Sequence, residues 1–209
     1  MNKFFFTIIS FLALAFLTNC SARKTTPTAD PLTTDIGVTI NGITWATRNV
    51  DAPGTFAANP EDAGMLFQFN RRKGWSAVDE KVEDWDRFNR TGTKWYAEND
   101  PCPEGWRVPT EEELQSLVDA GSEWVTQNNV KGRLFGTASG QLFLPAAGWR
   151  GPLSGEFVNG GMWGLRGNYW SSTPSGMLNA VRLNVTSTNS VVDASYRAPA
   201  FSVRCVKIK

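Results

Sequence analysis

Residues 102–121 read CPEGWRVPTEEELQSLVDAG and contain the clearest helix signal in the chain. Thr110 is a good N-cap, and Glu113 follows it at the spacing of a capping box. The acidic residues after Thr110 occupy the first turn, where the helix dipole favours negative charge. We therefore predict a helix between Thr110 and Gly121, and its apolar face is formed by Leu114, Leu117 and Val118.

The segments on either side of this helix favour β-structure. Val38–Ile40 and Ile43–Thr47 are β-rich runs joined by Asn41-Gly42, which is a strong hairpin signal. Residues 51–101 are expected to be mostly loop, with one candidate strand at 65–69. Further short strands are expected at 142–144, 169–172, 179–185, 190–194 and 201–208. This pattern predicts an α+β fold that is loop-rich, with one main early helix and a small, mostly antiparallel sheet.

The N-terminus predicts export. Residues 1–3 give a positive start, and residues 4–17 form an almost unbroken apolar run. A run of about 14 residues is too short to span a bilayer and has the length of a signal-peptide core. Residues 17–20, LTNC, resemble the lipobox of bacterial lipoproteins, whose Cys is diacylated and becomes the mature N-terminus. We expect 1–19 to be a signal peptide and Cys20 to carry the lipid; the alternative is an ordinary cleaved signal beside a free Cys.

The rest of the chain predicts a tether followed by one domain. Residues 20–36 contain Pro, Thr and charge but little to bury, which is typical of a flexible linker. Residues 37–209 are enough for one domain with a sizeable core. Loss of residues 1–19 removes one of 21 basic residues and none of 20 acidic ones, so the mature net charge is 20 − 20 = 0. We therefore expect no nucleic-acid partner, and membrane contact through the lipid anchor only.

Cysteine usage predicts a disulfide. Once Cys20 is assigned to the anchor, Cys102 and Cys205 remain, and an exported protein with two cysteines is expected to join them. The bond would close a loop of about 100 residues, worth roughly 4.7 kcal/mol in chain entropy before any native strain. The alternatives are two buried thiols or two zinc ligands, although a chain with no His offers a poor zinc site.

Four sequence boxes resemble those of the Fibrobacter succinogenes major paralogous domain family. In order they are CPEGWRVPT (102–110), LPAAGWR (144–150), GNYWSST (167–173) and FSVRCV (201–206). The resemblance covers roughly residues 37–209. It implies a C-type-lectin-like fold and a location on secreted or surface lipoproteins. It implies this fold and location more firmly than any biochemical activity. In such a fold a Cys near the first helix pairs with one in the last strand, here Cys102 with Cys205.

A glycine-rich stretch after the second box holds the candidate binding site. Residues 148–167 include seven glycines, and the whole chain has nine Trp. Flat aromatic faces suit the apolar faces of sugar rings, while Arg and Asn supply directed hydrogen bonds. We predict a ligand-binding site made by Trp149, Arg150, Trp163, Arg166 and Asn168. The alternative is that the tryptophans fill a loop-rich core, which we favour for Trp45, Trp106 and Trp170 and leave open for Trp149 and Trp163.

No catalytic or metal site stands out. Without His, Ser–His and Cys–His nucleophile chemistry is excluded. Residues 107–113, RVPTEEE, are similar to the helix start of formylglycine-generating relatives of the lectin-like fold, but those enzymes use a free cysteine pair. No carboxylate pair is singled out for glycoside hydrolysis. The calcium motifs of sugar-binding lectins are absent, and residues 79–86 are interpreted as a solvated acidic loop. We expect no catalytic residue, metal or cofactor.

The sequence therefore predicts a non-enzymatic lipoprotein, on the outer membrane, that binds a glycan or a cell-envelope protein. Whether it faces the periplasm or the cell surface stays open. The alternative is a structural or assembly subunit, such as a surface filament component, whose mark would be an exposed edge strand or a broad apolar patch. A formylglycine-generating-like or carboxylate-dependent enzyme is the third hypothesis.

Overall fold

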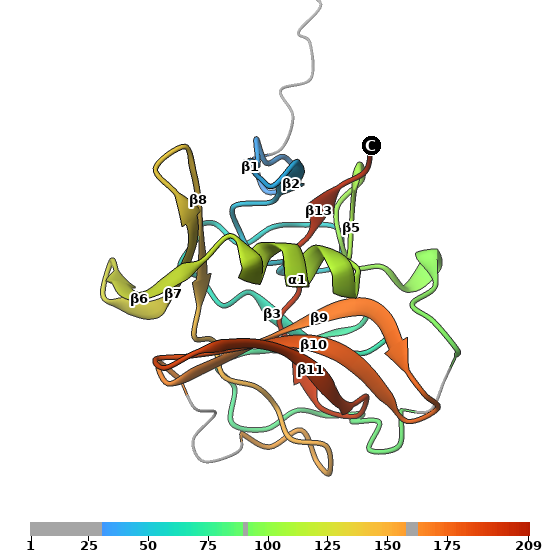
Figure 1. Cartoon of the computed structure of the whole chain (residues 1–209). Coiled ribbons are helices and arrows are strands. Elements are labelled where there is room, and N and C mark those ends of the chain that lie inside the picture. Colours follow the sequence, from blue (N-terminus) through green and yellow to red (C-terminus); the bar gives the residue numbers. More distant parts are fainter. Residues whose placement is uncertain (1–30, 90–91, 158–162) are drawn as a thin grey trace, which may run out of the picture.

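The computed structural model describes residues 31–89, 92–157 and 163–209. The predicted signal peptide, Cys20 and most of the predicted tether lie outside this part of the chain. In Figure 1 helix α1 (Glu111–Asp119) lies across the curved sheet that contains β9, β10 and β11, and the other labelled strands lie around it. None of the helices in the described ranges has both the length and the apolar character needed to cross a membrane.

The described strands form four antiparallel sheets, with strand orders β1-β2-β13-β5, β11-β10-β9, β12-β3-β4 and β6-β7-β8. The strands are β1 (Val38–Ile40), β2 (Ile43–Trp45), β3 (Met65–Gln68), β4 (Gly74–Ser76), β5 (Trp106–Arg107), β6 (Ser122–Gln127), β7 (Val130–Thr137), β8 (Gly140–Pro145), β9 (Arg166–Ser175), β10 (Asn179–Thr186), β11 (Ser190–Tyr196), β12 (Ala200–Phe201) and β13 (Val206–Lys207). The helical elements are the one-turn η1 (Ala97–Asn99) and α1 (Glu111–Asp119).

The prediction of an α+β, C-type-lectin-like fold is wrong. The described residues are mostly β, and their arrangement is closer to a β-sandwich, with one nine-residue α-helix beside four sheets. The difference lies after α1, where β6 and β7 form a hairpin and the sequence predicts no strand. Glycines and charged residues within β7 hide its alternation, and its turn uses Asn128 and Asn129 at positive φ.

The local predictions are confirmed where short-range signals carried them. The Asn41-Gly42 turn joins β1 to β2, with φ of 49° and 76°. A strand occupies the apolar piece that begins at Met65, and the strands predicted between 142 and 194 coincide with β8 to β11. The single strand predicted for 201–208 is wrong, because only the short strands β12 and β13 form there and residues 202–205 lie between them outside any strand. Trp45, Trp106 and Trp170 are all buried, as expected for core residues.

Helix α1 begins with the predicted capping box. Thr110 Oγ1 accepts a hydrogen bond from the Glu113 backbone N–H at 3.3 Å, and Glu113 Oε2 accepts one from the Thr110 N–H at 2.8 Å. Arg107 adds two further donors to the Glu113 carboxylate, at 2.8 and 2.7 Å. Burial alone would raise the pKa of Glu113, but the hydrogen bonds from Arg107 and Thr110 outweigh it and hold this pKa below its ordinary value. The start of α1 is thereby fixed to β5.

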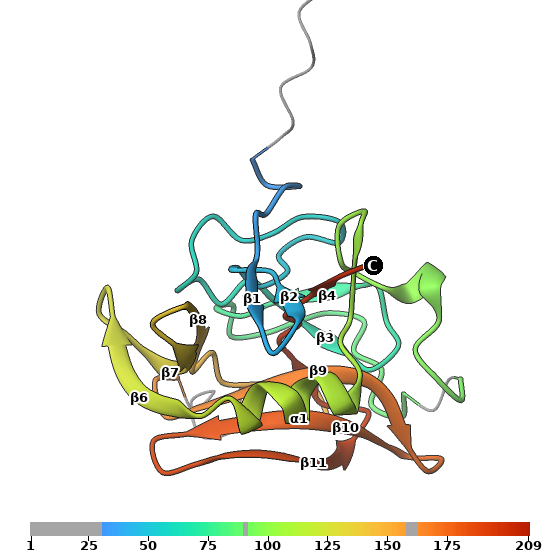
Figure 2. The same cartoon turned by 45° about the horizontal axis from the view of Figure 1, so that its top comes forward.

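Strand β9 divides the interior into two cores, because successive side chains of a strand point to opposite faces. Tyr169 joins Leu114 and Leu117 in the core between β9 and α1, and Figure 2 shows α1 beside β9 and β10. Trp170 joins the aromatic core on the other face, where its ring lies 4.4 Å from that of Phe201, centroid to centroid. A covalent bond closes this second core, since Cys102 and Cys205 form the predicted disulfide within it.

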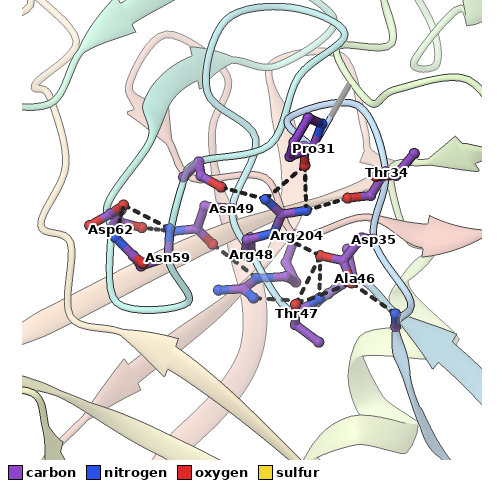
Figure 3. A network of polar contacts seen from close by, with 12 residues as sticks. Pro31, Thr34, Asp35, Ala46, Thr47, Arg48, Asn49, Asn59, Asp62 and Arg204 are labelled. Carbon is purple, nitrogen blue, oxygen red and sulfur yellow. Dashed lines mark hydrogen bonds and ion pairs between the residues drawn. The ribbon is translucent and has the colours of Figure 1, made fainter. Parts of the chain in front are cut away.

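Contacts with the domain begin inside the predicted tether (Figure 3). Asp35 accepts a hydrogen bond from the Thr47 backbone N–H at 3.0 Å and pairs with Arg48 Nε at 3.2 Å. Arg48 also donates to the carbonyl of Pro31 at 3.2 Å, and the carbonyl of Leu32 accepts from the Phe56 N–H at 2.6 Å. The tether predicted for residues 20–36 is thus held to the domain from Pro31 onward.

Buried arginines bind the loops together. Arg204, at the centre of the network in Figure 3, donates to the Asn49 side chain at 3.0 Å and to the carbonyls of Ala46 and Phe143 at 3.3 and 3.2 Å. Its burial lowers its pKa to about 10. Arg197 has the same design: it donates at 2.7 to 3.0 Å to three carbonyls, those of Gly92, Gly176 and Asn179. Each side chain therefore ties together segments that are distant in sequence.

The ion pair at the start of α1 yields a test of stability against pH. Because the pKa of Glu113 is lowered in the folded state, its charge stabilises the fold above the ordinary glutamate pKa of 4.5, and this contribution is lost as the pH falls through the lowered value. We expect Glu113→Gln to cost about 1 kcal/mol at neutral pH. In acid the cost should vanish, because the wild-type carboxylate is then protonated as well.

Urea unfolding of both proteins at neutral pH and in acid measures this difference. Glu123→Gln, at an exposed position of β6, is the matched control and should change stability little at either pH. An equal loss for Glu113→Gln at both pH values would show that the charge of Glu113 is not what stabilises the helix start.

Candidate functional site

The five predicted site residues lie along the chain from the end of β8 into β9, and the structure does not bring all of them to the surface. Arg150 and Asn168 are fully buried. Trp149 and Arg166 are half-buried, whereas the side chain of Trp163 is 39% exposed. Only the last three are thus open to contact with a ligand.

Arg150 is part of the scaffold. Its guanidinium donates to the carbonyls of Ser76 at 2.7 Å and Gly155 at 2.6 Å, and also to the carbonyl of Asp79. Its charge lies over the ring of Phe157 at 4.1 Å. Desolvation lowers the pKa of Arg150, and the nearby Asp79 opposes this shift. All three arms of the guanidinium are used within the protein, so Arg150 fixes the loops around the candidate site rather than a ligand.

Asn168 belongs to a polar row across the sheet of β9, β10 and β11. Its Oδ1 accepts hydrogen bonds from Asn184 Nδ2 at 2.8 Å and from Arg182. Arg182 in turn pairs with Asp193 on β11 at 3.0 Å. Because both neighbours of Oδ1 are donors, the amide orientation of Asn168 is fixed. Its Nδ2 is left buried without a hydrogen-bond partner in the protein.

Trp163 lies at the edge of a hollow of about 550 Å³. Its backbone neighbour Gly164 donates to the carbonyl of Ala146 at 2.9 Å, which attaches this turn to the end of β8. Apolar side chains line the hollow together with the carboxylates of Asp51, Glu61 and Asp62. The Glu61 carboxylate is oriented by the β6–β7 hairpin, since its Oε1 accepts hydrogen bonds from Gln127 at 2.6 Å and Asn128 at 2.8 Å.

Arg166 lies in a second hollow, of about 510 Å³, with a polar lining. The other residues of this hollow are Leu165, Asn184, Thr186, Ser187, Thr188, Asn189, Val191 and Asp193. The Arg166 guanidinium lies 5.5 Å from the ring centroid of Trp149, a cation–π contact. Its Nε is buried and has no hydrogen-bond partner in the protein. The terminal N–H groups of Arg166, on a side chain that lines the hollow, take part in no ion pair within the described residues, so they can donate to an acceptor from outside.

A third hollow, of about 340 Å³, lies next to both and is lined by Asn129, Lys131 and Ala146 among others. This middle hollow shares Val130 and Trp163 with the first and Leu165 with the second. We call the three together the 163–166 groove. Its walls come from four distant parts of the chain, and sequence reasoning missed every wall residue outside the glycine-rich stretch, because no local pattern marks them.

Two further surface features lie outside the groove. An apolar hollow of about 600 Å³ contains Met177 and Leu178 at the β9–β10 turn, with Arg197 beneath them. Met177 is 85% exposed. Strand β11 is an edge of its sheet, and the exposed Tyr196 at its end lies beside this turn, opposite Asn179 in the strand register. Such an edge offers backbone groups to a further strand.

The described ranges contain no cluster of three Cys, Asp or Glu side chains placed to hold a metal ion. The acidic segment that begins at Asp79 is used within the protein: Asp86 pairs with Arg71, and Asp84 pairs with Lys73 at 3.5 Å. The RVPTEEE segment is likewise accounted for by the capping box of α1 and the Arg107–Glu113 pair.

Comparison with known proteins agrees with the four sequence boxes. The family model of the Fibrobacter succinogenes major domain matches residues 38–207. The search of curated proteins returned no match, and neither did the search of solved structures. The matched range begins at β1 and ends with β13, so it takes in every sheet and the whole 163–166 groove. This chain belongs to the Fibrobacter succinogenes major domain family.

Proposed function

We propose that this protein is a non-enzymatic binding module of the cell envelope, and that the 163–166 groove holds a glycan. The observation that carries the proposal is Trp163, whose partly exposed ring lies between two hollows. Large aromatic side chains are mostly buried, and of the eight other tryptophans in the described ranges five are buried and three are partly buried, whereas Trp163 is the one that is exposed. A Trp left open in a groove is typical of a binding site.

The groove has the size and chemistry that a sugar chain needs. A hollow of about 550 Å³ lies within the usual range for small-ligand sites, roughly 300–1,000 Å³. The Trp163 ring offers a flat face to the C–H groups of a pyranose, and the carboxylates of Asp51, Glu61 and Asp62 accept hydrogen bonds from hydroxyl groups. The hydrogen bonds from the β6–β7 hairpin hold Glu61 in place before a ligand arrives, which lowers the entropy cost of binding.

Binding rather than catalysis is supported by what the polar groups already do. The chain has no His, and Cys102 and Cys205 are joined in a disulfide. Of the arginines nearest the groove, Arg150 is buried in the scaffold and Arg166 is stacked on Trp149. The setting of the proposal is the outer membrane, with the mature chain attached through lipid on Cys20. A lipid anchor in the membrane and an open groove suit a protein that holds an envelope or environmental glycan.

A glycan array tests the proposed site. The mature chain, residues 20–209 with Cys20→Ser to keep it in solution, should bind a subset of glycans, and Trp163→Ala should weaken that binding at least about tenfold, or about 1.4 kcal/mol. Tyr196→Ala is the matched control, because Tyr196 is an exposed aromatic residue outside the groove. No binding to any glycan, or equal binding by the Trp163 variant, would rule out the site.

The anchor has its own test. In a bacterial host that lipidates exported proteins, the wild-type chain should stay with the membrane fraction through high-salt washes, because acyl chains are insensitive to ionic strength. The full-length Cys20→Ser variant should move to the soluble fraction. Labelling with a radioactive fatty acid should mark the wild type alone. A variant that stays in the membrane would show that something other than lipid on Cys20 holds the chain there.

A second candidate function is assembly, and the open edge of β11 favours it. The strand carries neither Lys nor Pro, the residues that commonly protect sheet edges, and it ends beside the apolar hollow around Met177. If the domain assembles through this edge, Ala194→Lys should abolish self-association in sedimentation velocity and leave glycan binding unchanged. A wild-type chain that stays monomeric at high concentration would remove self-assembly from consideration.

A further inference from the structure

We propose that the Arg166 end of the groove binds a carboxylate, so that the ligand is an acidic glycan, one that carries a uronic acid or another carboxylate-bearing sugar. This inference rests on the proposed function, because it names the class of glycan that the same groove would hold. It is drawn from how the hydrogen-bond donors and the charges are distributed along the groove.

Arg166 differs from the scaffold arginines in what its guanidinium contacts. Arg150, Arg197 and Arg204 each donate to three acceptors within the protein. Arg166 makes no ion pair within the described residues, and its Nε is buried with no acceptor. The planar guanidinium lies over the Trp149 ring, which restricts its motion. A fixed guanidinium with unused donors suits the two oxygens of a carboxylate, which it can bind in bidentate fashion.

A second unpaired donor lies next to this end of the groove. Asn168 Nδ2 is buried without a partner, and its orientation is fixed because Oδ1 already accepts from two donors. One of these is Asn184, which lines the Arg166 hollow. Behind the wall of this hollow there is thus a donor that is also left without an acceptor. Because Asn168 is fully buried and lines none of the hollows, its Nδ2 does not reach a ligand, and the charged donors at this end of the groove come from Arg166.

The two ends of the groove carry charges of opposite sign. At the Trp163 end the charged side chains are the carboxylates of Asp51, Glu61 and Asp62. At the other end the negative charge of Asp193 is already paired with Arg182 at 3.0 Å, so Arg166 leaves that hollow with a net positive charge, and Lys131 in the middle hollow adds a second positive charge. A carboxylate would be repelled at the first end and attracted at the second. The acidic sugar therefore sits at Arg166, and neutral hydroxyl-rich sugars occupy the Trp163 end.

The lining of the Arg166 hollow supports a sugar rather than a bare anion. Hydroxyl and amide groups from the β10–β11 turn face it, from Thr186, Ser187, Thr188 and Asn189, and the exposed Leu165 and Val191 supply apolar surface. A small anion would leave most of a hollow of about 510 Å³ to solvent. A sugar ring has both the volume and the mixture of hydroxyl and C–H surface that this lining fits.

The experiment compares matched acidic and neutral ligands. The soluble mature chain is titrated with uronic acid oligosaccharides and with their methyl esters, which keep the sugar ring and lose the charge. We expect the wild type to bind the acid at least about tenfold more tightly than the ester, and this preference to fall as salt is raised. Arg166→Gln should lose most of this preference, by losing affinity for the acid and keeping that for the ester.

Two control variants keep the result interpretable. Arg87→Gln removes an exposed arginine outside the groove and should retain the full preference. Arg166→Lys keeps the charge but not the planar fork, so it should retain part of the preference, and its thermal unfolding checks that changes at this position leave the fold intact.

The outcomes separate this inference from the proposed function. Binding of acid and ester with equal affinity by the wild type, with loss of both in Trp163→Ala, would overturn the carboxylate subsite and leave the glycan groove standing. An acid preference that survives in Arg166→Gln would overturn the role of Arg166. Failure of the wild type to bind any oligosaccharide of either kind would overturn both proposals together.

Discussion

Buried guanidinium groups are the interaction on which this domain depends. Its strands are short and its connections long, so many backbone carbonyls have no partner in a sheet, and a buried carbonyl without a donor is costly. Arg150, Arg197 and Arg204 supply the missing donors, each to three acceptors from segments far apart in sequence. The cost is the desolvation of three charges, which is visible in the pKa of Arg204, lowered to about 10.

These arginines explain how a loop-built surface can be a binding site. The three hydrogen bonds from the Arg150 guanidinium connect Gly155 with Ser76, at the end of β4, and with Asp79, which follows β4. Ser76 also lines the Trp163 hollow. Strand β9 begins with Arg166, which lines the groove, and its later residues separate the two cores. Loops around the proposed groove are therefore held by hydrogen bonds from a buried side chain, which lowers the entropy cost of binding.

Arginine side chains have two different roles in this structure. The role depends on whether acceptors within the protein surround the guanidinium. Arg150 and Arg166 stand sixteen positions apart in one glycine-rich stretch, and each lies near an aromatic ring. Arg150 is enclosed by carbonyls, whereas Arg166 keeps a buried Nε that nothing in the protein accepts. The proposed acidic ligand follows from this difference, since each buried arginine of the described residues has acceptors within the protein, whereas the half-buried Arg166 lines a hollow without one.

By itself the sequence determined the features that neighbouring residues control. The capping box fixes the start of α1, Asn41-Gly42 fixes the first hairpin, and the cysteine count together with the family boxes fixes the pair Cys102–Cys205, because each depends on spacing along the chain. Only the tertiary structure decided the rest. It showed a mostly β fold where α+β was predicted, because strands such as β7 are defined by partners rather than by their own pattern. It also buried two of the five predicted site residues and supplied the opposite walls of the groove from remote segments, since burial and long-range contact are properties of the folded chain.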